Sequence, residues 1–202
     1  FMPQTGQLEN TIHFNYFIGD QLINVKYRDA RKNFKLYKGA EKVFYNINST
    51  VGYDWCVIVE GEMDVLALHE AGIKNVISVP NGATLNSNNL DYLDNCIDYL
   101  EDKQKIILAV DADEAGSALR QEFIRRLGAE ACYLVDFNGD KDANDFLINH
   151  GSEALRKVID KAVQVPLEGV STLKVFEAEL LDFVQNGFKP GSQVGLENFD
   201  NI

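Results

Sequence analysis

The chain has 202 residues, 46% of them hydrophobic, and a formal net charge of −12 at pH 7. This length suits one ordinary domain with attachments, and the hydrophobic content is normal for a globular core. No apolar run approaches the roughly 18 residues that a membrane span needs, and the basic-then-apolar pattern of a secretion signal is not seen. We therefore expect a cytoplasmic protein without a membrane partner.

The sequence lacks the common patterns of zinc sites and nucleophilic catalysis. Cys56, Cys96 and Cys132 are far apart and form no C-x-x-C pair, which argues against a zinc site and a disulfide framework. No Ser/His/Asp or Cys/His set is visible, and there is no G-x-x-x-x-G-K-[ST] loop of an NTPase.

The charge is unevenly distributed along the chain. Residues 26–42 hold seven positive and two negative side chains, a local charge of +5, so the remainder carries −17. A basic strip on an acidic body can follow a phosphate backbone even when the net charge argues against it. Nucleic acid therefore stays among the expected partners.

Residues 1–52 predict a small β-rich domain. Ile12, Phe14 and Tyr16 alternate with polar residues, and a Gly-Asp turn leads to a second apolar run, which indicates a hairpin over residues 12–28. Residues 34–38 predict a third strand, and residues 43–47 a short apolar element. The polar segment 48–54 marks a domain boundary.

Residues 53–165 predict an α/β domain, because strands and helices alternate there. The predicted strands are residues 56–60, 75–79, 105–110 and 131–135. The predicted helices are residues 62–71, 88–101, 114–127, 145–149 and 152–163. This pattern is typical of a parallel sheet with crossover helices.

Residues 166–202 predict a linker with one helix, residues 171–186. The helix carries an apolar stripe: Leu173, Phe176, Leu180, Leu181 and Val184. Such a stripe near a chain end docks onto a neighbouring protein or folds back on its own domain, and the sequence favours neither. The Phe1-Met2-Pro3 start and the end just after a linker-like segment indicate a piece of a longer protein.

Carboxylates follow two of the predicted strands. Glu60 ends the first strand, whereas Glu62 and Asp64 open a helix, where the helix dipole alone explains an acid. Asp111 and Asp113 follow the third strand and point the same way, because alternate strand residues share a face. Open α/β sheets place ligands at the carboxyl ends of their strands, and clustered carboxylates need a cation, so this edge predicts a Mg²⁺ site. Alone, the aspartates would also fit a helix N-cap with solvated acids.

Two loops at the same edge add polar groups. Residues 139–145 follow the fourth strand, where Asp142 would support a metal and Lys141 a phosphate, although a plain polar loop is the alternative. Residues 80–84 contain Gly82 before a predicted helix, which suits either a phosphate contact or a turn.

The acidic segments resemble the three signatures of a Toprim domain, the fold shared by primases, topoisomerases and some nucleases. These segments are residues 59–64 (Val-Glu-Gly-Glu-Met-Asp), 111–116 (Asp-Ala-Asp-Glu-Ala-Gly) and 141–145 (Lys-Asp-Ala-Asn-Asp). Residues 25–28 and 38–40 resemble the subdomain that precedes Toprim in phage-type and Twinkle-type primase–helicases. Residues 171–202 resemble their linker helix.

The resemblance implies a Rossmann-like α/β fold with roughly four parallel strands and flanking helices. It also implies synthesis of short RNA primers from ribonucleoside triphosphates on single-stranded DNA, with Mg²⁺, or Mn²⁺ as a substitute. Glu60 would be the general base or position a metal. Metal would be held by Glu60, Asp111, Asp113 and Asp142, with Asp145 as an alternative helper. Template or triphosphate would be bound by Lys26, Arg28, Lys35, Lys38 and Lys141.

The resemblance leaves alternatives open. Ser117 stands where many relatives have a basic residue, and this stretch shows no zinc-binding module or helicase motor. A non-catalytic module for DNA binding and coupling in a replicative helicase is the main alternative, and a Toprim nuclease is the weaker one. We expect a helicase domain in the same bacterial or phage-encoded chain, a hexamer for the full-length protein and a monomer for this piece.

Overall fold

The computed structural model describes residues 1–81, 90–167 and 177–186, and the chain divides into two compact units, residues 1–165 and 166–202. The second unit contains helix α6 (Glu177–Asn186), which matches the end of the helix predicted over residues 171–186. Residues 171–176 lie outside the described residues. Among the described helices, none is long and apolar enough to cross a membrane.

The first unit begins with an antiparallel sheet in the order β1-β2-β3. The predicted hairpin is present as β1 (Thr11–Ile18) and β2 (Gln21–Asp29), joined by a turn in which Gly19 has a positive φ. The third strand, β3 (Phe34–Leu36), pairs with β2 and ends two residues earlier than predicted. One face of this sheet buries Phe14 and Tyr16, as the alternation indicated.

The second sheet has five strands in the order β5-β4-β6-β7-β8. Four of them are parallel, as predicted: β4 (Trp55–Val59), β5 (Val76–Ser78), β6 (Lys105–Leu108) and β7 (Cys132–Leu134). The fifth strand, β8 (Val163–Gln164), was not predicted and runs antiparallel to β7. The helix predicted over residues 152–163 ends at Asp160, because the next residues pair with the open edge of β7.

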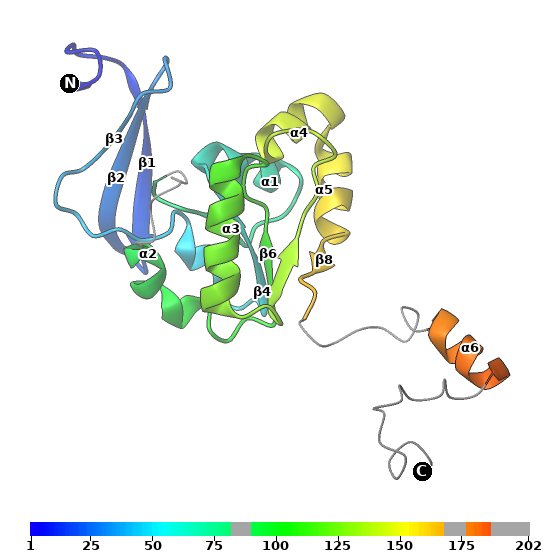
Figure 1. Ribbon diagram of the computed structural model, residues 1–202. Helices are drawn as coiled ribbons and strands as arrows, with labels where there is room; N and C mark the ends of the chain where they lie inside the picture. The colour runs from blue at the N-terminus through cyan, green and yellow to red at the C-terminus, as the bar shows by residue number, and fades with distance from the viewer. Residues whose placement is uncertain (82–89, 168–176, 187–202) are drawn as a thin grey trace, which may run out of the picture. The chain divides into compact units, whose positions relative to one another are not determined.

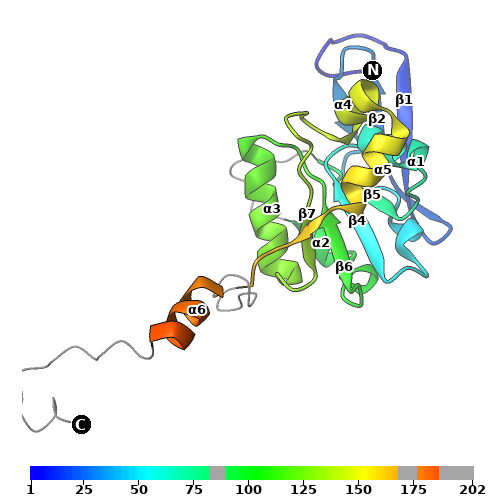
Figure 2. The same ribbon diagram turned by 90° about the vertical axis from the view of Figure 1, so that its right-hand side faces the viewer.

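Helices cover both faces of this sheet (Figure 1; Figure 2). On one face, α1 (Glu62–Glu70), α4 (Ala143–His150) and α5 (Ser152–Asp160) pack over Val57, Val59 and Ile107. On the other, α3 (Glu114–Leu127) packs over Cys56 and Ile58. Because alternate residues of one strand enter opposite cores, the central strands are buried on both sides.

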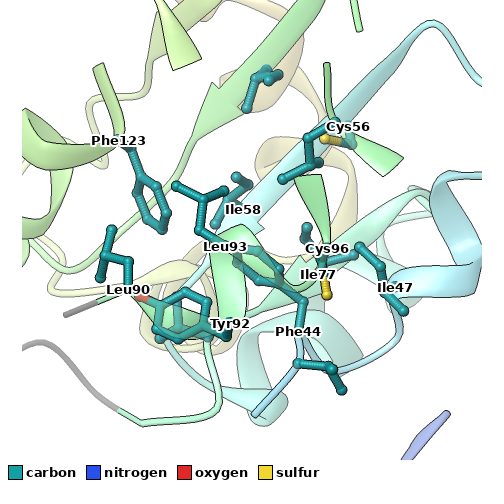
Figure 3. Packing of buried hydrophobic residues seen from close by; sticks show 14 of the residues in the cluster. Phe44, Ile47, Cys56, Ile58, Ile77, Leu90, Tyr92, Leu93, Cys96 and Phe123 are labelled. Atoms are coloured by element: carbon teal, nitrogen blue, oxygen red, sulfur yellow. The ribbon is translucent and has the colours of Figure 1, made fainter. Parts of the chain in front are cut away.

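The core on the α3 side of the parallel sheet also joins the two sheets. It contains Phe14 and Tyr16 of β1 together with Ile58 of β4. Figure 3 shows Phe44 of the connecting segment beside Tyr92 and Phe123, with ring centroids 4.9 and 6.3 Å from that of Phe44. Residues 1–165 therefore form one compact unit, and the domain boundary at residue 52 stays a prediction.

One predicted helix is wrong. Residues 88–101 were expected to form one amphipathic helix, but the described part contains only α2 (Asp91–Asp94) and the 3₁₀ turn η2 (Ile97–Tyr99). The Asn95 side chain donates a hydrogen bond to the Lys42 carbonyl oxygen. Tyr92, Leu93 and Cys96 are buried in the core, so the packing of the apolar residues prevails over the helical period.

Candidate functional site

A cleft of about 830 Å³ lies between the three-stranded sheet and the carboxyl edge of the parallel sheet. The first sheet contributes Lys26, Arg28 and Phe34 to its lining. The strand ends contribute the acidic side chains: Glu60, Glu62, Asp64, Asp111, Asp142 and Asp145. Cations and carboxylates thus meet in one polar cavity, at the edge where open α/β sheets bind ligands.

Three carboxylates in this cleft are grouped as metal ligands would be. Oxygens of Asp64, Asp111 and Asp142 all lie within 4.8 Å of one another. Burial, together with the neighbouring carboxylates of Asp142 and Asp111, raises the pKa of Asp64 to about 7. Burial also raises the pKa of Asp111, against the opposing effect of Lys141. A divalent cation would offset this repulsion, and three hard oxygens suit Mg²⁺, so the residues present fit the expected metal.

Backbone contacts orient the group. The Asn144 N–H donates to Asp64 Oδ1 at 3.0 Å. Asp142 caps α4, and its Oδ1 accepts from the Asp145 N–H at 2.8 Å. The Asp111 backbone N–H donates to Glu60 Oε1 at 3.1 Å. The helix starts and strand ends therefore hold the carboxylates in place before any cation binds.

Gly116 permits the approach of Glu60 to the end of β6. A Cβ at this position would lie 2.2 Å from the Asp111 carbonyl oxygen and 2.6 Å from Glu60 Oε1. Such distances are far below a van der Waals contact, and the carbonyl cannot rotate away as a flexible side chain would. The close packing of α3 against the acidic strand end therefore requires glycine.

Asp113 takes a different place from the one predicted for a metal ligand. Its side chain caps α3 by accepting from the Gly116 N–H at 2.9 Å, and half of its surface is exposed. It does not belong to the group of three metal-ligand candidates found among the described residues. Lys141 Nζ lies 2.7 Å from Asp111 Oδ2 and 3.9 Å from Asp113 Oδ2. The structure thus brings Lys141 to the acids and leaves Asp113 at the rim.

A buried ion pair joins the two sheets below the cleft. Lys26 Nζ lies 2.8 Å from Glu62 Oε1, and these side chains are only 8% and 3% exposed. The Tyr16 hydroxyl donates to the same carboxylate oxygen. Burial raises the pKa of Tyr16 above its usual range, and the Glu62 charge adds to this, so the hydroxyl stays protonated as a donor. The three side chains connect β1, β2 and the start of α1.

Of the predicted basic residues, only some reach the cleft. Lys26, Arg28 and Lys141 line it, whereas Lys35 and Lys38 do not. In the β2–β3 register Phe34 pairs with Arg28 and Lys35 pairs with Tyr27. Since successive strand residues point to opposite faces, Lys35 lies on the far side of the sheet from Phe34. The Lys35 Nζ lies 5.9 Å from the centroid of the Tyr27 ring.

Sequence reasoning missed two residues of this site. Asp64 and Glu62 were explained by the helix dipole at a first helical turn, yet they are buried at the cleft, at 6% and 2% exposure. A helix that begins directly after a buried strand places its first turn at the edge of the sheet. This position of Glu62 and Asp64 in the sequence was the signal that could have identified them. In the predicted loop of residues 80–84, Pro80 and Asn81 line the cleft, and residues 82–84 lie outside the described part.

The chain is similar to several known proteins. Residues 57–147 match the family model described as Toprim-like. A Twinkle homologue of Arabidopsis thaliana is 32% identical over 96% of this chain and 30% of its own length. A primase homologue of the same plant is 36% identical over 79% of this chain and 52% of its own length.

Among solved structures, the primase fragment of the bacteriophage T7 primase–helicase matches with a TM-score of 0.62 and 25% identity. The match covers 73% of this chain and 62% of that one. The chain therefore spans about a third to a half of the length of these two curated relatives. Residues 57–147 are a Toprim-like domain, in a chain that resembles the primase part of phage-type and Twinkle-type primase–helicases.

Proposed function

We propose that this chain is a DNA primase core, which joins ribonucleotides into short RNA primers on single-stranded DNA. The observation that carries the proposal is the cleft in which Asp64, Asp111 and Asp142 face Lys26 and Arg28. Phosphoryl transfer depends mainly on positioning and charge neutralisation, and this cleft supplies both signs of charge. The similarity to primases from plants and phage supports the same reaction.

The acidic and basic residues of the cleft have different roles in this proposal. Asp64, Asp111 and Asp142 would hold Mg²⁺, or Mn²⁺ in its place, which neutralises charge on the phosphates. Arg28, Lys26 and Lys141 bind the triphosphate or the template backbone. Glu60 is the general base or orients the metal ligands, since it already accepts a hydrogen bond from the Asp111 backbone. Glu60 within the cleft and Asp113 at the start of α3 would be further metal-positioning carboxylates.

The partners follow from the same proposal. Single-stranded DNA and ribonucleoside triphosphates are the substrates. The match covers 30% of the Twinkle homologue and 62% of the primase fragment of the T7 primase–helicase. We infer a helicase domain in the same protein, which would assemble as a hexamer, with residues 166–202 as the linker between the two.

The test is primer synthesis by the full-length protein on single-stranded DNA with Mg²⁺ and ribonucleotides. Asp111→Asn and Asp64→Asn should each lower the rate by about 100-fold or more, because each removes charge from the metal site. Asp102→Asn, an exposed acid outside the cleft, is the matched control and should keep the wild-type rate. Equal rates for wild type and Asp111→Asn would contradict the proposal.

A non-catalytic DNA-binding module is the second candidate. It is favoured by one contact: Lys141 Nζ lies 2.7 Å from Asp111 Oδ2 and offsets the charge of that carboxylate. If wild type makes no primers and releases no heat with Mg²⁺ in calorimetry while DNA binding persists, the coupling role replaces the enzymatic one. Cleavage of the DNA in the same reaction would instead indicate a Toprim nuclease.

A further inference from the structure

We propose that Phe34 forms a stacking site for a nucleobase on the wall of the cleft. This inference rests on the proposed function, because the base would belong to the template strand or to an incoming ribonucleotide. It adds a recognition element that the acidic and basic residues do not supply.

Phe34 is an exposed aromatic residue within a charged cleft. Its surface is 42% exposed, it lines the cleft, and it belongs to neither hydrophobic core. Leu36, on the same face of β3, lines the cleft as well. An apolar pair in this position stabilises no core, so its face is available to a ligand.

Two cations lie close to the Phe34 ring. Lys26 Nζ is 4.9 Å and Arg28 Cζ is 5.7 Å from the ring centroid. Both cations come from β2, which pairs with β3. At the other edge of β3, Gln4 Nε2 donates to the Phe34 carbonyl oxygen at 2.6 Å. Because Phe34 is 42% exposed and lines the cleft, part of this residue is open to a ligand there.

This arrangement matches the two parts of a single-stranded nucleotide. Proteins that bind single strands combine a basic groove for the backbone with aromatic rings on which bases stack. A base stacked on the exposed part of Phe34 would bring its phosphate near Arg28. The acids of the metal site line the same cleft, so the stacked nucleotide would lie near the reacting phosphates.

The first experiment measures the affinity of the 202-residue chain for a labelled oligothymidylate by fluorescence anisotropy at fixed salt. Phe34→Ala should weaken binding about 10-fold, the usual cost of losing one stacked base, whereas Phe34→Trp should keep it. The salt dependence of binding should not change, because no phosphate contact is removed. Tyr37→Ala is the matched control, since Tyr37 is 63% exposed nearby but does not line the cleft.

Two further arms identify the source of the base. With an abasic oligonucleotide of the same length, Phe34→Ala should bind as wild type does, if the template supplies the base. If the ribonucleotide supplies the stacked base, Phe34→Ala should bind oligothymidylate with the wild-type affinity. Phe34→Ala then raises the KM for ribonucleotides in primer synthesis by the full-length protein with little change in kcat.

Three results would overturn the stacking site: Phe34→Ala equal to Tyr37→Ala in both affinity and KM, Phe34→Trp as weak as Phe34→Ala, or an equal loss with the abasic strand. Thermal unfolding of each variant separates these results from misfolding. A chain that makes no primers but loses DNA affinity in Phe34→Ala would refute the enzymatic function while keeping the stacking site.

Discussion

The buried Lys26–Glu62 pair gives the sharpest test of how the two sheets are held together. Glu62→Gln keeps the shape and one acceptor for the Tyr16 hydroxyl but removes the negative charge. Lys26 is then left without its partner at 8% exposure. Breaking a buried ion pair from one side costs about 3 to 5 kcal/mol. We expect the lower end, about 3 kcal/mol, because Lys26 also lines the cleft, where water reaches it.

Unfolding by urea or heat measures this cost. For a unit of this size, about 3 kcal/mol corresponds to a fall in Tm of about 6 to 12 °C. The double variant Lys26→Met with Glu62→Gln should recover most of the loss, since no unpaired buried charge remains. The control is Glu153→Gln, which removes an exposed helical pair, Glu153 and Lys157 at 84% and 66% exposure, and should leave Tm unchanged.

Two outcomes would refute this reasoning. A Glu62→Gln protein less than about 1 kcal/mol below wild type would mean that water or neighbouring carboxylates already screen Lys26. A double variant no more stable than Glu62→Gln would mean that the cost comes from shape and not from charge. Either result would also argue against a role of Glu62 in positioning Lys26 at the cleft.

Three more expectations follow from the site. Without metal, the free energy of unfolding should fall as the pH rises from 3.8 toward about 7, because folding raises the pKa of Asp64 and the folded state keeps that proton longer. Asp64→Asn should remove this fall in the free energy of unfolding, up to about 4 kcal/mol, in urea titrations with EDTA. A fall of unchanged size in this variant would show that Asp64 is not its source. Gly116→Ala should lower Tm although alanine normally favours a helix by about 1 kcal/mol, since its Cβ would meet Asp111 and Glu60; a rise in Tm, as for an ordinary helical site, would show that the contact relaxes. Arg28→Ala should reduce the salt slope of single-stranded DNA binding by about one, whereas Lys35→Ala, on the opposite face of the sheet, should leave the slope unchanged. Equal effects of the two substitutions would mean that Arg28 and Lys35 lie on the same DNA-binding surface.

Much of the fold was predictable because local periodicity reflects which faces are buried. The hairpin at β1 and β2 follows from alternation, and the four parallel strands follow from apolar runs separated by helical segments. The failures occur where tertiary pairing decides. Strand β8 forms because β7 offers an open edge, and residues 91–99 form short turns in which Leu93 and Cys96 enter the core.

The candidate site divides in the same way. The chain alone indicated acids at the ends of β4 and β6 and a basic strip before them, because residue type and position at a strand end are local properties. Only the tertiary structure decided which of those acids meet: Asp64 joins Asp111 and Asp142, whereas Asp113 caps a helix at the rim.

The tertiary structure also decided which cations face these acids. Lys26 and Arg28 line the cleft, and Lys35 does not, because the pairing of β3 with β2 sets the face on which each side chain lies. Residue order determines what groups are present and which elements carry them. Distances between groups far apart in the chain depend on how those elements pack, so the geometry of the site appears only in the folded protein.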